Sequence, residues 1–358
     1  MNIFPFVFFS FFVNIIFTPI ILRMSKRRGW LDQPNHRTVH KDPVPRLGGV
    51  GIFASFFIAV LLALLLDTFK LAKWPESTWN WQFFLLIVGA GSTHVLGVLD
   101  DFVEFRAVYK FLLQLFGAVL AIGAGLVVPG ISLPFKGWTL DFGPLAPLIT
   151  LVWIVGVTNA VNLIDGMDGL AGGFSVIALS SLGVYGLLVG LPMVSLLAFA
   201  VVAAVLAFLV FNFPPAKIFM GDSGSLFLGY MLATLPLIGG SKSLFSVLWI
   251  LPIVIVLFPL SDTLAAIIRR LRDGRAIWSP DRFHTHHKLL DLGLSPKQIL
   301  PWIYGTTLLT AVPVVLAGFP LGHSQVISLW IASLSLGLIV LVLFSTLHFV
   351  YYAKHKKG

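Results

Sequence analysis

Residues 145–173, LAPLITLVWIVGVTNAVNLIDGMDGLAGG, join an apolar run to a cluster of polar residues and glycines. The first half has the composition of a membrane helix, which needs about 20 mostly apolar residues to cross a bilayer. The second half places Asn159, Asn162, Asp165 and Asp168 at three-residue spacing where a membrane helix should end. Their oxygens are hard ligands that suit Mg²⁺, and helix capping is the alternative role. The stretch therefore predicts a membrane helix that ends in a polar site.

The whole chain has the composition of a membrane protein. Of its 358 residues, 58% are hydrophobic and 11% are charged, whereas soluble domains have about 25% charged residues. Cysteine is absent, which excludes disulfides and cysteine-ligated metals. We predict an all-α, polytopic integral-membrane helical bundle that forms one domain over residues 1–358. Its 11 predicted transmembrane helices cover roughly residues 2–23, 47–66, 82–99, 108–127, 144–161, 170–190, 193–211, 224–240, 244–268, 298–318 and 324–350.

Basic residues are divided unequally between the two sides of this predicted bundle. The loops after odd-numbered spans, together with the C-terminal tail, contain 20 of the 24 lysines and arginines. Cytoplasmic loops collect Lys and Arg, so this side is predicted to be cytoplasmic, with the N-terminus outside and the C-terminus inside. The same rule accounts for the net charge of +9 without a nucleic-acid partner. Twelve of the 15 acidic residues lie on or near this side, and a cytoplasmic reaction centre would explain them.

The stretch GVLDDFVEFRAVYK, residues 97–110, places two carboxylates side by side at the end of a predicted span. Asp100 and Asp101 repel each other unless a cation lies nearby, and either a divalent metal or Lys110 would serve. Two solvated loop aspartates are the alternative interpretation.

The stretch FMGDSGS, residues 219–225, places Asp222 among glycines at a predicted helix start. Asp222 could be a simple N-cap. A glycine-rich helix N-terminus also suits phosphate, and an Asp there can hold Mg²⁺ while the backbone amides meet the phosphate oxygens. The preceding Phe219 could stack on a planar base, and a membrane anchor is its other possible role.

A basic stretch, RRLRDGRAIWSPDRFHTHHKLL, occupies residues 269–290. His284, His286 and His287 would form a poor closed zinc site without other ligands. A cationic cradle for pyrophosphate fits better, with arginines such as Arg282 as bidentate donors. A solvated loop would explain the arginines but not the three histidines. Asp262, inside a predicted span, is either a functional acid or a partner for the neighbouring arginines.

Acids, amides and a cationic cradle at a membrane boundary together indicate an enzyme. It would bind a water-soluble pyrophosphate from the cytoplasm and react it with a molecule in the bilayer, with Mg²⁺, or Mn²⁺ in its place, neutralising the phosphoryl group. Two rivals remain at this point. One is a secondary transporter, although its polar groups would lie at the midplane. The other is an intramembrane aromatic prenyltransferase, because residues 162–168 have the spacing of a Mg²⁺-binding aspartate-rich motif.

The four motifs GVLDD, NAVNLIDGMDGLAGG, FMGDSGS and SPDRFHTHH, in this order, resemble the polyprenyl-phosphate N-acetylhexosamine-1-phosphate transferase family (glycosyltransferase family 4). The resemblance covers about residues 32–290. The HRTVHKDPVPRLGG stretch and the His-x-His-His form resemble the bacterial branch that uses UDP-GlcNAc or similar sugars. Thr285 stands where that branch leads us to expect an aliphatic residue.

The resemblance implies a reaction, a location and a set of roles. Undecaprenyl phosphate would attack the β-phosphate of a UDP-N-acetylhexosamine at the cytoplasmic face of the bacterial inner membrane, and UMP would leave. Membrane lipids would surround the enzyme, and a homodimer is a further expectation. Asp222, with Asn162, would hold Mg²⁺, and Asp100, Asp101 and Lys110 would lie by the lipid phosphate. The expected contacts of the UDP-sugar are Asn159, Asp165, Asp168, Phe219, Arg282, His284, His286 and His287.

Overall fold

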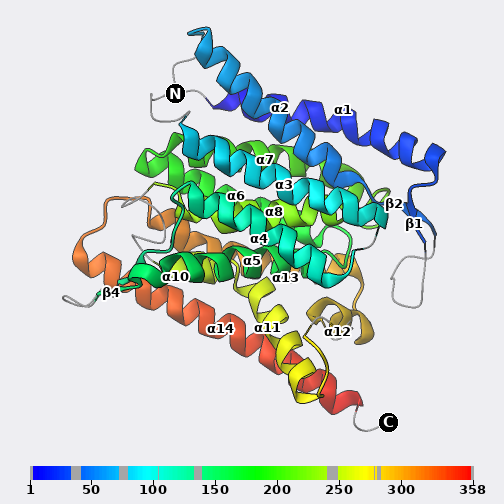
Figure 1. The fold of residues 1–358 in the computed structure, drawn as a ribbon. Coiled ribbons are helices and arrows are strands. Elements are labelled where there is room, and N and C mark those ends of the chain that lie inside the picture. Colours follow the sequence, from blue (N-terminus) through cyan, green and yellow to red (C-terminus); the bar gives the residue numbers. More distant parts are fainter. Residues whose placement is uncertain are drawn as a thin grey trace.

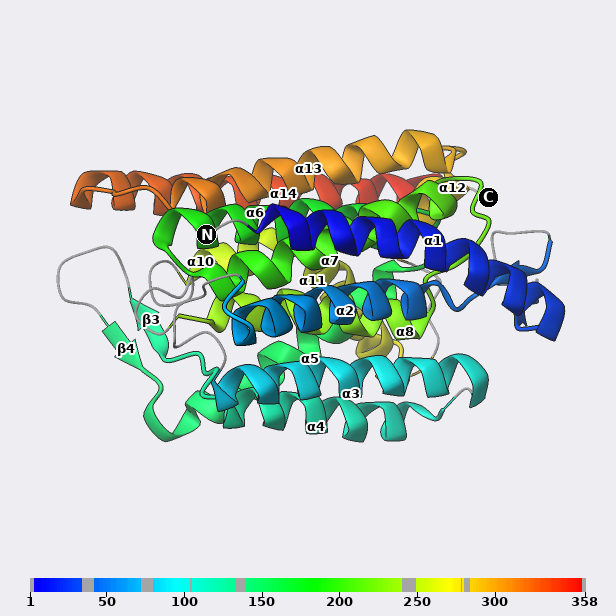
Figure 2. The same cartoon turned by 90° about the horizontal axis from the view of Figure 1, so that it is seen from above.

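The protein is a bundle of long helices whose axes are nearly parallel or antiparallel to one another (Figures 1 and 2). The computed structural model describes residues 3–33, 42–71, 80–103, 105–132, 139–239, 249–277, 279 and 284–355. Within these ranges, 8 helices are long and apolar enough to cross a membrane, as expected for a multi-pass membrane protein. They are α1 (Phe4–Arg28), α2 (Gly48–Thr68), α3 (Trp81–Val103), α5 (Ala146–Ile164), α6 (Leu170–Val189), α7 (Pro192–Asn212), α13 (Pro296–Leu316) and α14 (His323–His355).

Shorter elements complete the described part of the chain, and the predicted all-α class is confirmed. The shorter helices are α4 (Ala107–Gly123), α8 (Asp222–Thr234), α10 (Ile250–Ile255), α11 (Leu257–Arg272) and α12 (Thr285–Asp291), with 3₁₀ turns at Gly143–Leu145 and Leu235–Leu237. Two small antiparallel hairpins pair β1 (Leu31–Asp32) with β2 (Val44–Pro45) and β3 (Gly130–Ser132) with β4 (Thr139–Asp141). Each predicted apolar run overlaps a helix, although the count of 11 membrane crossings stays a prediction.

The predicted span 244–268 differs most from the structure. It is interrupted at Val256, between α10 and α11, and α11 then runs steeply to the bundle direction (Figure 1). Pro259 explains the interruption, because its ring lacks an N–H and would clash with the carbonyl of Ile255 in a continuous helix. The interruption directs α11 toward α12 at one end of the bundle.

Helix α8 lies at the centre of the fold. It packs against α2, α3 and α5, and residues 223–234 are all buried. Glycines allow this close approach, as is common where membrane helices meet. A Cβ on Gly97 of α3 would lie 2.3 Å from the backbone oxygen of Asp222, and a Cβ on Gly49 of α2 would lie 2.1 Å from the backbone nitrogen of Gly224. The N-terminus of α8 is therefore held between two helices.

The chain begins and ends at opposite ends of the bundle (Figures 1 and 2). Hairpin β3–β4 lies at the end where the chain begins, and hairpin β1–β2 and helix α12 lie at the other end (Figure 2). An odd number of crossings would give this arrangement. Which end faces the cytoplasm stays a prediction.

Candidate active site

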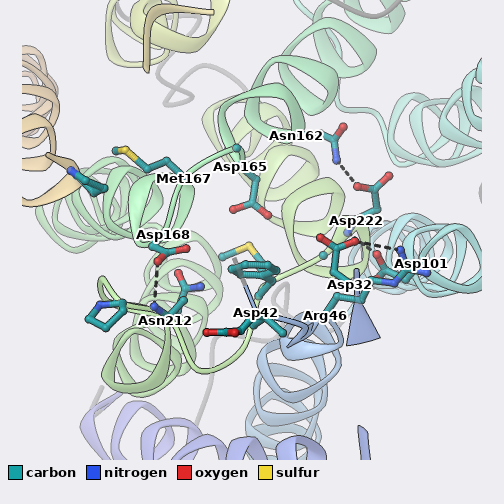
Figure 3. Close-up of a pocket in the computed structure, with 18 of the residues that line it drawn as sticks. Asp32, Asp42, Arg46, Asp101, Asn162, Asp165, Met167, Asp168, Asn212 and Asp222 are labelled. Carbon is teal, nitrogen blue, oxygen red and sulfur yellow. Dashed lines mark hydrogen bonds and ion pairs between the residues drawn. The ribbon is translucent and has the colours of Figure 1, made fainter. Parts of the chain in front are cut away.

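A pocket of about 610 Å³ is lined in part by residues of β1, β2 and α12, so it lies at the end of the bundle that carries these elements. Figure 3 shows its lining. This size lies within the usual range of small-molecule sites, roughly 300–1,000 Å³. The pocket brings together residues from five regions of the sequence. They are Asp32, Asp42, Val44, Arg46, Asp101, Asn162, Asp165, Gly166, Met167, Asp168, Asn212, Pro215, Ala216, Phe219, Met220, Gly221, Asp222, His287 and Pro296.

Asp222, the first residue of α8, is the centre of a polar network. Lys110 of α4 donates to its Oδ2 at 3.0 Å, and the same ammonium group forms an ion pair with Asp100. Asn162, near the end of α5, donates to the Oδ1 atom of Asp222 at 3.0 Å and to the hydroxyl of Ser225 at 2.8 Å. Three of the motifs found in the sequence therefore meet at one carboxylate.

Asp101 caps the N-terminus of α8. Its Oδ1 accepts the backbone N–H of Asp222 at 2.9 Å, and its Oδ2 accepts that of Ser223 at 3.2 Å. A cap of this kind satisfies backbone donors that have no partner within the helix. Gly221, just before α8, has φ +72°, and a Cβ there would lie 2.6 Å from Asp101 Oδ2. The two adjacent aspartates thus have different partners: Asp100 forms an ion pair with Lys110, and Asp101 accepts hydrogen bonds from the backbone of α8.

The loop between α5 and α6 places Asp165 and Asp168 on the pocket wall. The carboxylate of Asp165 points into the pocket (Figure 3). Burial, followed by the negative charges of Asp222, Asp101 and Asp168, raises the pKa of Asp165 well above its usual range. Asp168 instead accepts the backbone N–H of Ala216 at 2.9 Å.

Asn212, at the end of α7, holds the same loop in place through one of its two side-chain hydrogen bonds. Its Oδ1 accepts the backbone N–H of Gly169 at 2.9 Å, and its Nδ2 donates to the carbonyl of Ile218 at 2.9 Å. Tyr304 of α13 donates to the carbonyl of Gly169 at 2.6 Å. Sequence reasoning missed Asn212, although it shows the same signal as Asn159, an amide at the end of an apolar helix.

The pocket carries an excess of negative charge, because six aspartates and one arginine line it within the described ranges. No three Asp, Glu or His side chains in that part of the chain are grouped to chelate a metal ion. Mg²⁺ does not need such a cage, since it is usually bound by one or two carboxylates together with substrate phosphates and water. Asp222 and the amide of Asn162 fit that requirement.

The three histidines of the HTHH motif are divided between the pocket and the interior. His287 lines the pocket. His284 is buried, and its Nδ1 lies 2.8 Å from Asp262 Oδ2. His286 is 1% exposed and lies under the α5–α6 loop, where a Cβ on Gly166 would lie 2.5 Å from its Nε2.

The environment of His286 keeps its ring neutral. Burial, with the neighbouring His287 as the next cause, lowers the pKa of His286 to about 3. Neither ring nitrogen has a hydrogen-bond partner among the residues that the structure describes. The ring therefore serves as packing beneath Gly166 in this conformation.

The remaining residues singled out in the sequence differ in where the structure places them. Asn159 is paired with Gln114 of α4, whose Oε1 accepts from it at 2.5 Å, and it does not line the pocket. Asp262 pairs with His284 and Thr285, whereas an arginine partner was the alternative considered. Phe219 lines the pocket, and its contact with the nucleotide stays a prediction. Arg282 lies outside the described residues.

Four pocket residues, Val44 and three charged ones, lie in the stretch before α2 and were not predicted as site residues. Asp32 and Arg46 face each other across hairpin β1–β2, with 3.8 Å between Arg46 Nη1 and Asp32 Oδ1. Asp42 precedes β2. Backbone hydrogen bonds dock this segment onto the loop before α8: Phe219 N–H donates to the Pro45 carbonyl at 2.7 Å. No local pattern signals this docking.

Comparison with known proteins identifies the family. Residues 83–240 match the model of glycosyl transferase family 4. A probable undecaprenyl-phosphate N-acetylglucosaminyl 1-phosphate transferase of Bacillus subtilis (strain 168) is 38% identical over 297 residues, which cover 82% of this chain and 79% of the relative. A decaprenyl-phosphate N-acetylglucosaminephosphotransferase of Mycolicibacterium smegmatis is 33% identical, over 78% of this chain and 73% of the relative. An undecaprenyl-phosphate alpha-N-acetylglucosaminyl 1-phosphate transferase of Yersinia pestis is 27% identical, over 81% and 77% respectively. With these likenesses over most of its length, the chain belongs to glycosyl transferase family 4.

Proposed function

We propose that the protein transfers N-acetylglucosamine-1-phosphate, or a related N-acetylhexosamine-1-phosphate, from a UDP-sugar to undecaprenyl phosphate and releases UMP. The observation that carries the proposal is the network in which Lys110 and Asn162 hold Asp222 at the mouth of the membrane bundle. The names of the relatives supply the substrate class. Family membership argues against both the transporter and the aromatic prenyltransferase.

The reaction exchanges one phosphoanhydride for another. An oxygen of the lipid phosphate forms a bond to the β-phosphorus of the UDP-sugar, and the bond from that phosphorus to the bridging oxygen of UMP breaks. The lipid phosphate has a second pKa of about 6, so it is mostly dianionic at pH 7 and needs little help from a base. The main requirement is to offset the repulsion between two anions. We therefore favour direct displacement without a covalent phospho-aspartate.

The residues around Asp222 suit that requirement. Lys110 would exchange part of its contact with Asp100 and Asp222 for the lipid phosphate. Asp222 and Asn162 would hold Mg²⁺, or Mn²⁺ in its place. When bound, the ion would supply positive charge to the reacting phosphates.

The remaining pocket residues would contact the donor. Asp165 and Asp168 lie on the wall that would face the nucleotide, and Phe219 offers a ring on which the uracil could stack. His287 would face the sugar or the pyrophosphate. Asn159, His284, His286 and Arg282 complete the proposed donor side, the first three acting through their neighbours.

The proposed setting is the cytoplasmic face of the bacterial inner membrane. The whole chain would act there as a single domain among membrane lipids, and a homodimer is part of the same proposal. The product would begin a cell-surface polysaccharide, such as O-antigen, common antigen or the linkage unit of teichoic acid.

The test is UMP release by detergent-purified protein given undecaprenyl phosphate, Mg²⁺ and a panel of UDP-N-acetylhexosamines. We expect release that needs both the lipid and the metal and that is lost in Asp222→Asn. UMP release with a UDP-sugar other than UDP-GlcNAc would change the identity of the donor and leave the proposed type of reaction unchanged. Silence with every UDP-sugar, in protein shown to be folded, would refute the proposal.

A further inference from the structure

Asp262 is a buried carboxylate that the proposed reaction does not use. It lies in α11, is 3% exposed and does not line the pocket. Within the described part of the chain, all of its side-chain hydrogen bonds go to the start of α12. Its Oδ2 accepts from His284 Nδ1 at 2.8 Å, and its Oδ1 accepts from the backbone N–H of Thr285 at 2.8 Å and from the Thr285 hydroxyl at 2.7 Å.

These three contacts join two consecutive helices across the segment that links them, since His284 follows Asp262 by 22 positions. They hold the residue before α12 and its first residue, and α12 has only seven residues. The same short helix carries His286, which lies beneath Gly166, and His287, which lines the pocket. A shift at the start of α12 would therefore move His287 relative to the pocket.

We propose that Asp262 is a positioning residue, which with His284 and Thr285 forms a clamp that sets the place of His287 in the donor side of the pocket. The effect on turnover rests on the proposed function, whereas the position of α12 does not.

The chemistry of the clamp requires each of its three members. A buried carboxylate is stabilised by the hydrogen bonds that its oxygens receive. Losing His284 would leave Oδ2 without its donor, and losing the Thr285 hydroxyl would leave Oδ1 with the backbone N–H alone. An aliphatic residue at position 285 could supply the backbone N–H but not the hydroxyl. The Thr285 side chain, which looked like a minor departure in the sequence, is thus part of the support of Asp262. Donation from Nδ1 also fixes the orientation and tautomer of the His284 ring.

Three variants remove different parts of the hydrogen-bond set that forms this clamp. Thr285→Val removes one hydrogen bond with little change in shape. Asp262→Asn places an amide N–H against the Nδ1–H of His284 and so removes the hydrogen bond between these two side chains. Asp262→Ala removes all three. The matched control is Thr263→Val on the same helix, because among the described residues the Thr263 hydroxyl donates to the Pro259 carbonyl of its own helix alone, at 2.9 Å.

Steady-state kinetics should show an effect on the kinetic constants for the UDP-sugar donor and little effect on those for the lipid acceptor. We expect kcat/KM for the UDP-sugar to fall about tenfold or more in Asp262→Asn, the size of one hydrogen bond to a charged group, and less in Thr285→Val. The KM for undecaprenyl phosphate should stay within about twofold, because Lys110 does not touch the clamp. Asp262→Glu should recover part of the loss. Equal loss toward both substrates would indicate general destabilisation and overturn the proposal.

A second measurement needs no turnover. The chain has no cysteine, so Leu289→Cys, at a position of α12 that is 6% exposed, gives one reporter thiol for a maleimide. We expect slow labelling in the otherwise native chain and in Thr263→Val, and faster labelling with Asp262→Ala or Thr285→Val. Unchanged labelling in both clamp variants would refute the positioning role. If no UDP-sugar is turned over, the proposed function fails while labelling alone decides the clamp.

Discussion

Lys110 is the residue on which the electrostatics of the site depend. Its ammonium group lies between Asp100 and Asp222, two carboxylates that would otherwise repel each other. Coulomb repulsion of this kind is strong where water is scarce. The same group is placed to receive a second anion, which an acceptor phosphate would provide.

Replacing Lys110 by Met should therefore abolish most of the activity. We expect turnover to fall about 10²–10³-fold, the usual loss when one electrostatic contact to a reacting group is removed. UMP release measures the effect, and Lys70→Met, at the end of α2, is the control. Retention of more than half of the activity by Lys110→Met would rule out its role at the acceptor phosphate.

Asp165 should make the protein less stable as the pH rises. Its pKa is raised in the folded state, whereas in the unfolded chain it is about 3.9. The folded state thus binds more protons, so the stability that this group contributes is present below pH 4 and is lost as the pH rises through the folded pKa. We expect Asp165→Asn to melt at a higher temperature than the native protein at pH 7, with a smaller difference at pH 5.

Thermal unfolding in detergent without Mg²⁺ measures this effect. Asp273→Asn, at an exposed carboxylate outside the pocket, is the control and should show no such trend. A lower melting temperature for Asp165→Asn at pH 7 would show that the carboxylate is stabilised in the pocket and would contradict the prediction.

At the scale of elements, the approach of α3 to α8 determines the geometry around Asp222. Gly97→Ala would place a Cβ 2.3 Å from a backbone oxygen and 2.4 Å from the Ser223 Cα. Neither atom can move without shifting a helix, so Asp101 would leave its cap. We expect a loss of about 1–3 kcal/mol in stability, together with most of the UMP release.

The control for this substitution is Gly156→Ala in α5, where a Cβ would meet nothing within 4 Å. It should be neutral or slightly stabilising, because alanine restricts the unfolded chain more than glycine does. Thermal unfolding and UMP release compare the two variants. Equal melting temperatures and equal UMP release for Gly97→Ala and Gly156→Ala would show that α3 and α8 do not need the close approach at Gly97.

The apolar runs predicted the helices well because a membrane helix needs only length and hydrophobicity. They could not predict that α10 and α11 are separate, although Pro259 is visible in the sequence. They also could not predict the docking of residues 45–49 onto the loop before α8, because those hydrogen bonds are between backbone groups. Elements that form locally were predictable, and those defined by distant partners were not.

The same distinction applies to the site. Asp165 and Asp168 were proposed because polar residues follow an apolar run, and Asp222 because it begins a helix among glycines, with Phe219 just before it. The pocket brings these four residues together. The partner of Asp262 depends on where the start of α12 lies relative to α11, which no spacing reveals. Gln114 was missed for the same reason, since its partner Asn159 lies on another helix.

For the whole molecule, the predicted orientation puts the pocket on the cytoplasmic side. Asp141→Cys in β4 and Arg272→Cys at the end of α11 place single thiols at exposed positions at the two ends of the bundle. In intact spheroplasts, a membrane-impermeant maleimide should label the Asp141→Cys protein and leave Arg272→Cys unlabelled until the membrane is opened. The reverse pattern would invert the proposed topology.

In the proposed reaction a phosphosugar, and not a sugar alone, passes to the lipid. The direct measurement uses UDP-GlcNAc, or the UDP-sugar found active, labelled with ³²P at the β-phosphate and with ³H in the sugar. After reaction with undecaprenyl phosphate, both labels should enter the lipid fraction at the ratio of the donor, with UMP in the water. Tritium in the lipid without ³²P, accompanied by UDP, would contradict the proposed transfer.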